Sequence, residues 1–95
     1  MKIKFMPAVK KYPPEINIEL GEREILVKNI VEVISKKLKE EGFDEFTLPE
    51  TRVFLKNGTG IGRMEGDEFH VFDRYKNSKL EEEDRIAIIF PVSGG

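Results

Sequence analysis

Alternating hydrophobic and polar residues predict two strands in the first part of the chain. In residues 2–6, isoleucine and phenylalanine alternate with lysines, which is the period-two pattern of a strand with one buried face. Residues 15–20 repeat this pattern, and a proline-containing loop separates the two segments, so we expect an antiparallel hairpin. The residues expected on its buried face are Ile3, Phe5, Ile16, Ile18 and Leu20.

The middle of the chain changes to helical spacing. Residues 30–41 carry an aliphatic residue at every fourth position, which predicts a helix with one apolar stripe. Asn29 is the expected N-cap, with Glu32 completing a capping-box pattern, and Gly42 is expected to end the helix. The predicted stripe comprises Ile30, Ile34 and Leu38, with Val31 beside it.

Three more strands are predicted in the second half of the chain, at residues 51–56, 68–72 and 85–90. Asn57 and Gly58 form a strong turn signal after the first of them. Both faces of residues 85–90 are apolar, which predicts a strand in the centre of its sheet.

The predicted order of elements is therefore β-β-α-β-β-β. The helix supplies the connection that would let the first strand pair in parallel with the last. This pattern predicts an α+β fold of the β-grasp (ubiquitin-like) type, a mixed sheet with one main helix packed on one face. We expect residues 1–90 to form this domain and residues 91–95 to form a flexible C-terminal tail.

Composition narrows the possible functions. A chain of 95 residues has room for one core, and its 16 basic and 18 acidic residues leave a net charge of −2. This balance argues against nucleic acid as a partner. The chain has no cysteine, which rules out disulfides, thiolate metal sites and a persulfide carrier. With a single histidine, we expect no metal site and no permanently bound cofactor.

The location expected from the sequence is the cytoplasm. No signal-peptide pattern opens the sequence, and no apolar run is long enough to span a membrane. We therefore expect no membrane partner.

Three internal features are interpreted as structural rather than chemical. The glycine-rich residues 58–62 favour a mobile loop over a phosphate-binding loop, because no helix pattern follows them. His70 is expected to be an ordinary surface or half-buried histidine. The acidic residues 81–84 lack the spacing of a calcium loop and predict a solvated turn.

The most informative feature is the pair of glycines, Gly94 and Gly95, that ends the sequence. A frayed terminus is the ordinary interpretation. However, these residues follow a strongly apolar strand, and residues 91–95 would reach roughly 17 Å when extended. Because glycine has no Cβ, such a tail can enter a narrow channel. The carboxylate of Gly95 is the group expected to be activated as an acyl donor.

The last strand and tail resemble the C-terminal end of MoaD, the small subunit of molybdopterin synthase, and of the related small archaeal modifier proteins. This MoaD/ThiS-like group typically has a leucine, an acidic turn, an apolar strand, a proline and a terminal Gly-Gly. Here Glu83 and Asp84 replace the usual Gly-Asp turn, and Phe90 stands where the group often has a first proline. The matching residues outside the turn are Leu80, Pro91, Val92, Ser93, Gly94 and Gly95.

The resemblance implies a sulfur carrier rather than an enzyme. An ATP-dependent, ubiquitin-activating-like enzyme would adenylate Gly95, which would then become a thiocarboxylate. That group would donate sulfur in molybdenum cofactor biosynthesis, inside the large subunit of molybdopterin synthase, where the catalysis is expected. Alternatives are a sulfur carrier for tRNA thiolation, or a ubiquitin-like modifier conjugated through Gly95 to target lysines.

Two interpretations stand outside the resemblance: a β-grasp interaction module with an incidental Gly-Gly, and a small enzyme, which no nucleophile–base set supports. For a carrier, we expect the sheet face away from the helix to meet the partner. Phe90 and Val92 would flank the tail there, with Phe54 and Phe72 contributing.

Overall fold

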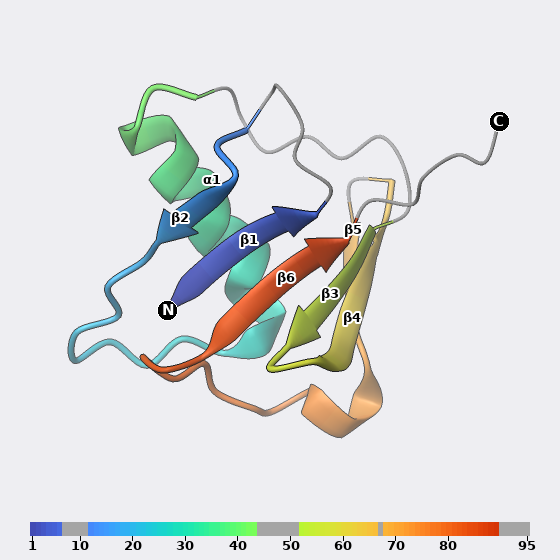
Figure 1. Ribbon diagram of the computed structural model, residues 1–95. Coiled ribbons are helices and arrows are strands. Elements are labelled where there is room, and N and C mark those ends of the chain that lie inside the picture. The colour runs from blue at the N-terminus through green and yellow to red at the C-terminus, as the bar shows by residue number, and fades with distance from the viewer. Residues whose placement is uncertain (7–11, 44–51, 67, 90–95) are drawn as a thin grey trace, which may run out of the picture.

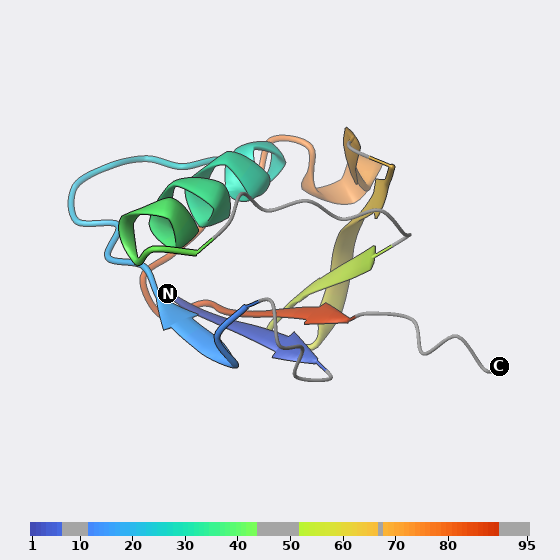
Figure 2. The ribbon, with the colours of Figure 1, turned by 90° about the horizontal axis from the view of Figure 1, so that it is seen from above.

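A mixed sheet of six strands, covered on one face by an α-helix, makes up the computed structural model (Figure 1). The structure describes residues 1–6, 12–43, 52–66 and 68–89. Viewed from above, helix α1 lies over one face of the sheet and leaves the other face open (Figure 2). This part of the chain is a small α+β domain.

The sheet has the strand order β2-β1-β6-β3-β4-β5. Its strands are β1 (Lys2–Met6), β2 (Glu15–Asn17), β3 (Arg52–Lys56), β4 (Thr59–Glu65), β5 (Glu68–Val71) and β6 (Arg85–Ile89). Between β2 and β3 lie the 3-10 turn η1 (Val27–Asn29) and helix α1 (Ile30–Glu40), and a second 3-10 turn, η2 (Asp73–Tyr75), follows β5.

The predicted N-terminal hairpin is confirmed. β1 pairs antiparallel with β2, and Ile3 lies opposite Ile16. β2 is shorter than the predicted segment 15–20, but the alternation continues beyond it, because Ile18 and Leu20 are also buried. The predicted parallel pairing of the first strand with the last is confirmed as well, since β1 pairs in parallel with β6.

The helix matches its prediction except at the cap. Ile30, Ile34 and Leu38 are fully buried, as the spacing predicts. Asn29 occupies the N-cap position, but its side chain makes no capping hydrogen bond. The predicted capping box is therefore wrong, because η1 runs directly into α1. Asn29 consequently has φ −102° and ψ 11° rather than the extended backbone that a capping side chain requires.

Gly42 ends the helix in the predicted way. Its φ of +85° is left-handed, a conformation that glycine adopts without steric cost. The amide of Gly42 donates to the carbonyl of Lys39 at 3.1 Å, and the amide of Phe43 donates to the carbonyl of Leu38 at 2.8 Å. This pair of bonds is the Schellman arrangement, which satisfies carbonyls at the end of a helix.

The loop predicted at residues 58–62 is wrong after Gly58, because residues 59–62 belong to strand β4. Asn57 and Gly58, with φ of 51° and 87°, do form the predicted turn between β3 and β4. A register shift then sets Phe54 opposite Gly62 and Leu55 opposite Gly60. Ile61 is left as an extra residue in β4. Such a bulge re-aims a side chain, and Ile61 is fully buried in the core.

Gly62 is required by a close approach inside the β4–β5 hairpin. A Cβ at this position would lie 2.6 Å from Cζ of Phe69 and 2.7 Å from the carbonyl oxygen of His70. The ring of Phe69 crosses this space to meet Phe54, with ring centroids 4.9 Å apart. The glycine therefore gives Phe69 access to the core.

Gly62→Ala is expected to lower the free energy of unfolding by about 1–3 kcal/mol, because either the Phe69 ring or the His70 backbone must move. Gly60→Ala is the matched control in the same strand. Its Cβ would meet Phe72 at an ordinary 3.4 Å, so we expect a change within about 0.5 kcal/mol. Urea unfolding of both variants measures the difference, and equal midpoints would contradict the close approach.

The segments before α1 and before β6 are joined by hydrogen bonds on the helix side of the sheet. Leu80 donates its amide to the carbonyl of Ile25 at 2.7 Å. The Lys79 ammonium hydrogen-bonds Glu24 at 2.9 Å and so lowers the pKa of that carboxyl. The pair therefore stabilises the fold above the ordinary pKa of glutamate, and this stabilisation is lost as the pH falls. Because both side chains are exposed to solvent, salt screens the interaction.

Candidate functional site

Strand β6 occupies the centre of the sheet, as its two apolar faces predict. It pairs in parallel with β1 and antiparallel with β3. Ile86 and Ile88 are buried beneath the helix. The strand is thus held from both edges and from one face as far as Ile89, the last residue that the structure describes. The predicted site residues Phe90, Pro91, Val92, Ser93, Gly94 and Gly95 lie outside the described residues.

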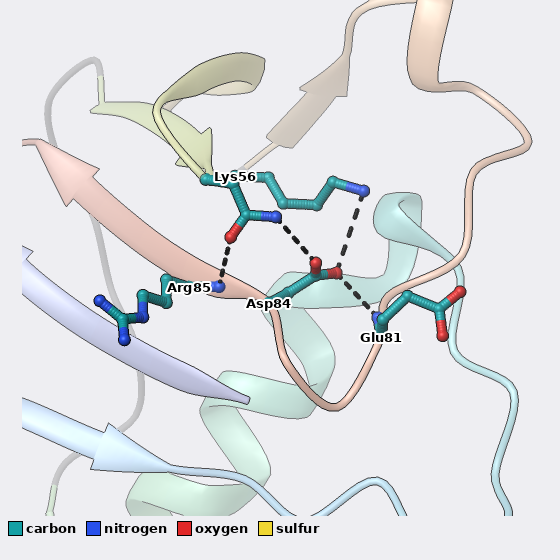
Figure 3. Close-up of polar contacts among 5 residues, drawn as sticks. Lys56, Glu81, Asp84 and Arg85 are labelled. Carbon is teal, nitrogen blue, oxygen red and sulfur yellow. Dashed lines mark hydrogen bonds and ion pairs between the residues drawn. The ribbon is translucent and has the colours of Figure 1, made fainter.

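The beginning of β6 is fixed by a buried carboxylate (Figure 3). Asp84 is 6% exposed. One carboxylate oxygen accepts from Nδ2 of Asn57 at 3.0 Å. The other accepts from the amide of Glu81 at 2.7 Å and lies 3.9 Å from Nζ of Lys56. Asp84 therefore connects the turn before β6 to the β3–β4 turn.

Asn57 completes this network through its backbone and its side-chain carbonyl. Its amide donates to the carbonyl of Arg85 at 2.8 Å, and its Oδ1 accepts from the Arg85 amide at 2.9 Å. The guanidinium of Arg85 points away from the network in Figure 3. The solvated turn predicted for residues 81–84 is thus wrong at Asp84, because a buried carboxylate is stable where donors surround it.

Asp84→Ala is expected to destabilise the domain by about 2–3 kcal/mol, because it leaves the Glu81 amide, Asn57 and Lys56 without their acceptor. Glu83→Ala removes an exposed carboxylate from the same turn and is expected to change stability by less than about 0.5 kcal/mol. Thermal and urea unfolding report the difference. Equal stability of the two variants would show that the network contributes nothing.

The open face of the sheet carries the exposed large hydrophobic side chains of the described residues. Met6, Ile89 and Val53 lie side by side in register on β1, β6 and β3. Their exposed fractions are 42%, 36% and 37%, and Phe72, just after β5, is 40% exposed. We call Met6, Ile89, Val53 and Phe72 the apolar row. Surfaces of this kind mark sites of protein contact.

Phe54 does not lie on this face, so its predicted contribution to a contact there is wrong, whereas Phe72 does lie on this face. Phe54 is fully buried against the helix side, because it alternates with its exposed neighbour Val53. Phe72 packs on the open face above Gly60 and near Leu55. The sequence prediction did not include Met6, Val53 or Ile89. These three side chains point to the sheet face opposite that of Phe5, Phe54 and Ile88. The alternation of side chains along each strand could therefore have identified them from the sequence.

Three cations occupy the other end of the open face. Lys2 lies in register with Arg85, and Lys4 with Ala87. A shallow hollow of about 500 Å³ lies between these side chains, Glu15 and the β3–β4 turn. The open face thus has cations where β6 begins and Met6, Ile89 and Val53 where β6 ends. Phe72 lies over Gly60, at the register level of Leu55 and Ala87.

His70 lies on the edge strand β5, away from this face's centre. It is exposed, as predicted, and its Nε2 lies 3.6 Å from carboxylate oxygens of both Glu65 and Glu68. Glu65 also pairs with Arg63 at 2.6 Å. No group of three or more metal-ligating side chains is present among the described residues.

Comparisons with protein-family models, with curated proteins and with solved structures find no match to the chain. In the part of the chain that the structure describes, no helix combines the length and the apolar composition needed to cross a membrane.

Proposed function

We propose that the protein is a sulfur carrier whose C-terminal glycine, Gly95, is adenylated and converted to a thiocarboxylate for molybdenum cofactor biosynthesis. The observation that carries the proposal is the position of β6. The strand that precedes the Gly-Gly sequence lies in the centre of the sheet, bonded on both edges and buried on one face. In the sequence, residues 90–95 follow directly from this central strand.

The topology supports the proposal. A mixed sheet with an N-terminal hairpin, a crossing helix and a final strand parallel to the first is compatible with the β-grasp fold. We propose that the domain belongs to this fold and resembles the MoaD/ThiS-like carriers in architecture as well as at residues 80–95. The additional strand β4, formed by residues predicted as a loop, extends the sheet on the side of β3.

The proposed chemistry uses the main chain rather than a side chain. The Gly95 carboxylate attacks the α-phosphorus of ATP and expels pyrophosphate. A donor of sulfur at the oxidation level of sulfide then displaces AMP and leaves a thiocarboxylate. A carboxylate is a poor electrophile until its oxygen becomes part of a good leaving group, and the acyl-adenylate supplies one. The partners proposed are a ubiquitin-activating-like enzyme and the large subunit of molybdopterin synthase.

The activation experiment uses the full chain, ATP, hydrosulfide and a ubiquitin-activating-like enzyme. We expect pyrophosphate release and an intact mass in which one oxygen is replaced by sulfur. A chain ending at Gly94 is the control, and its circular dichroism should match the parent because the last buried core residue described is Ile88. Sulfur incorporation by this control would contradict the role of Gly95, and no adenylation of the parent would contradict both carrier and modifier.

The alternative product, an isopeptide bond to a target lysine, starts from the same acyl-adenylate. Gel analysis of cells that express the tagged chain separates the two outcomes. Bands of higher mass that disappear without Gly95 would favour the modifier, whereas a thiocarboxylate without such bands favours the sulfur carrier.

The apolar row is proposed as the surface that the activating enzyme binds. Val53→Glu is expected to weaken binding at least about tenfold, because it places a charge in the centre of an apolar contact. Asn77→Glu adds the same charge at an exposed position that is not part of the row and is expected to bind as the parent does. Calorimetric titration with the enzyme compares them, and equal affinities would locate the interface elsewhere.

A further inference from the structure

Among the described residues, no strand pairs with the outer edge of β2. β2 is the first strand in the sheet order, and β1 pairs with only one of its edges. Met1 and Ile18 exchange two backbone hydrogen bonds, both of 2.9 Å, and Phe5 donates to Pro14 at 3.1 Å. Hydrogen-bonded pairs alternate along an antiparallel ladder. The amides and carbonyls of Glu15 and Asn17 therefore point away from β1, toward the free edge.

The free edge ends where the side chain of Arg23 binds the backbone. Glu19 belongs to the same outward-pointing set as Glu15 and Asn17. Its carbonyl accepts a hydrogen bond of 2.7 Å from the guanidinium of Arg23, which also donates to the Leu20 carbonyl at 3.2 Å. The available edge is thus short and centred on Asn17.

A groove accompanies this edge on the helix side. It encloses about 720 Å³ between β2, the segment that follows it, and helix α1. Ile16 and Ile18 contribute to its strand wall, and the half-buried Val33 contributes to its helix wall. Figure 2 shows β2 and α1 at the same side of the molecule, with the helix above the strand. A strand added to β2 would place alternate side chains in this groove.

The groove is acidic. Its lining contains five glutamates and three basic residues. Lys37 pairs with Glu41 at 3.6 Å, which leaves four glutamates against Arg23 and Lys36. Arg23 is engaged by main-chain carbonyls. Glu15 and Glu19 are exposed and flank Asn17 on the face of the strand opposite the core. Glu15 has Lys4 opposite it on β1, whereas the free edge supplies no cation on its other side among the described residues. Basic residues added across from Glu15 and Glu19 on the free edge would form favourable cross-strand pairs.

We propose that the β2 edge and its groove bind an extended basic peptide segment of another protein by strand addition. The peptide continues the sheet through hydrogen bonds to Glu15 and Asn17, places lysine or arginine opposite Glu15 and Glu19, and directs the apolar residues between them toward Val33. The site uses none of residues 90–95 or of the apolar row, so it does not depend on the proposed carrier function.

The probe is a synthetic peptide, Lys-Val-Thr-Val-Lys with blocked ends, titrated into the isotope-labelled full chain. We expect amide chemical-shift changes at Glu15, Asn17 and Val33, and weaker binding as salt is added. The same peptide with glutamate in place of both lysines should bind at least about tenfold more weakly, since its charges face Glu15 and Glu19. Absence of binding by the basic peptide, or shift changes centred on the open face, would overturn the proposal.

Two substitutions at Asn17 test the contribution of its backbone amide separately from that of its side chain. Asn17→Pro removes an outward amide, a change that edge strands tolerate, and is expected to abolish peptide binding while circular dichroism stays unchanged. Asn17→Ala keeps the amide and should bind as the parent does. A folded Asn17→Pro variant with parental affinity would refute strand addition.

The exposed charges give a second test that does not rely on the proline. The double substitution Glu15→Lys and Glu19→Lys alters only exposed side chains and should reverse the preference toward the acidic peptide. An unchanged preference would overturn the assigned orientation of the peptide.

Discussion

The parallel pairing of β1 with β6 is the constraint on which the rest of the structure depends. Parallel neighbours cannot be joined by a tight turn, so the intervening chain must cross the sheet. Helix α1 makes this crossing and buries Ile30, Ile34 and Leu38 against the inner face. Since β3 occupies the other edge of β6, the last described strand lies in the centre of the sheet. Polar contacts of Asp84 fix the beginning of β6, and its end adjoins the apolar row.

Much of this architecture follows from periodicity in the sequence. The hairpin, the helix stripe, the Gly42 stop and the central last strand each have a pattern that local physics makes unambiguous. β4 is different, because Gly60 and Gly62 have weak strand propensity and resemble a loop. Their roles depend on tertiary neighbours: Gly62 admits the Phe69 ring, and the bulge brings Ile61 into the core. Neither neighbour can be seen in a short sequence window.

The candidate site likewise contains residues that the sequence can predict and residues that it cannot. Asp84 could not be distinguished from the acidic residues beside it, because its role requires Asn57 and Lys56, which are distant in sequence. The apolar row follows from alternation once the phase of each strand is known, as Val53 and Phe54 show by facing opposite sides. The row and the β2 edge lie at different parts of the sheet, one on its open face and one along its border. Two partners could therefore be bound at the same time.

The central position of β6 also determines when the domain can fold. β1 and β6 stand at opposite ends of the described sequence, so their pairing has a high loop-closure cost and forms slowly. Until β6 arrives, β1 and β3 each present an unpaired edge, and the surface that receives Ile86 and Ile88 stays open to water. Such exposed edges accept foreign strands. A nascent or truncated chain that lacks β6 therefore exposes two strand edges and an apolar face, and we expect it to aggregate more readily than the chain that contains β6.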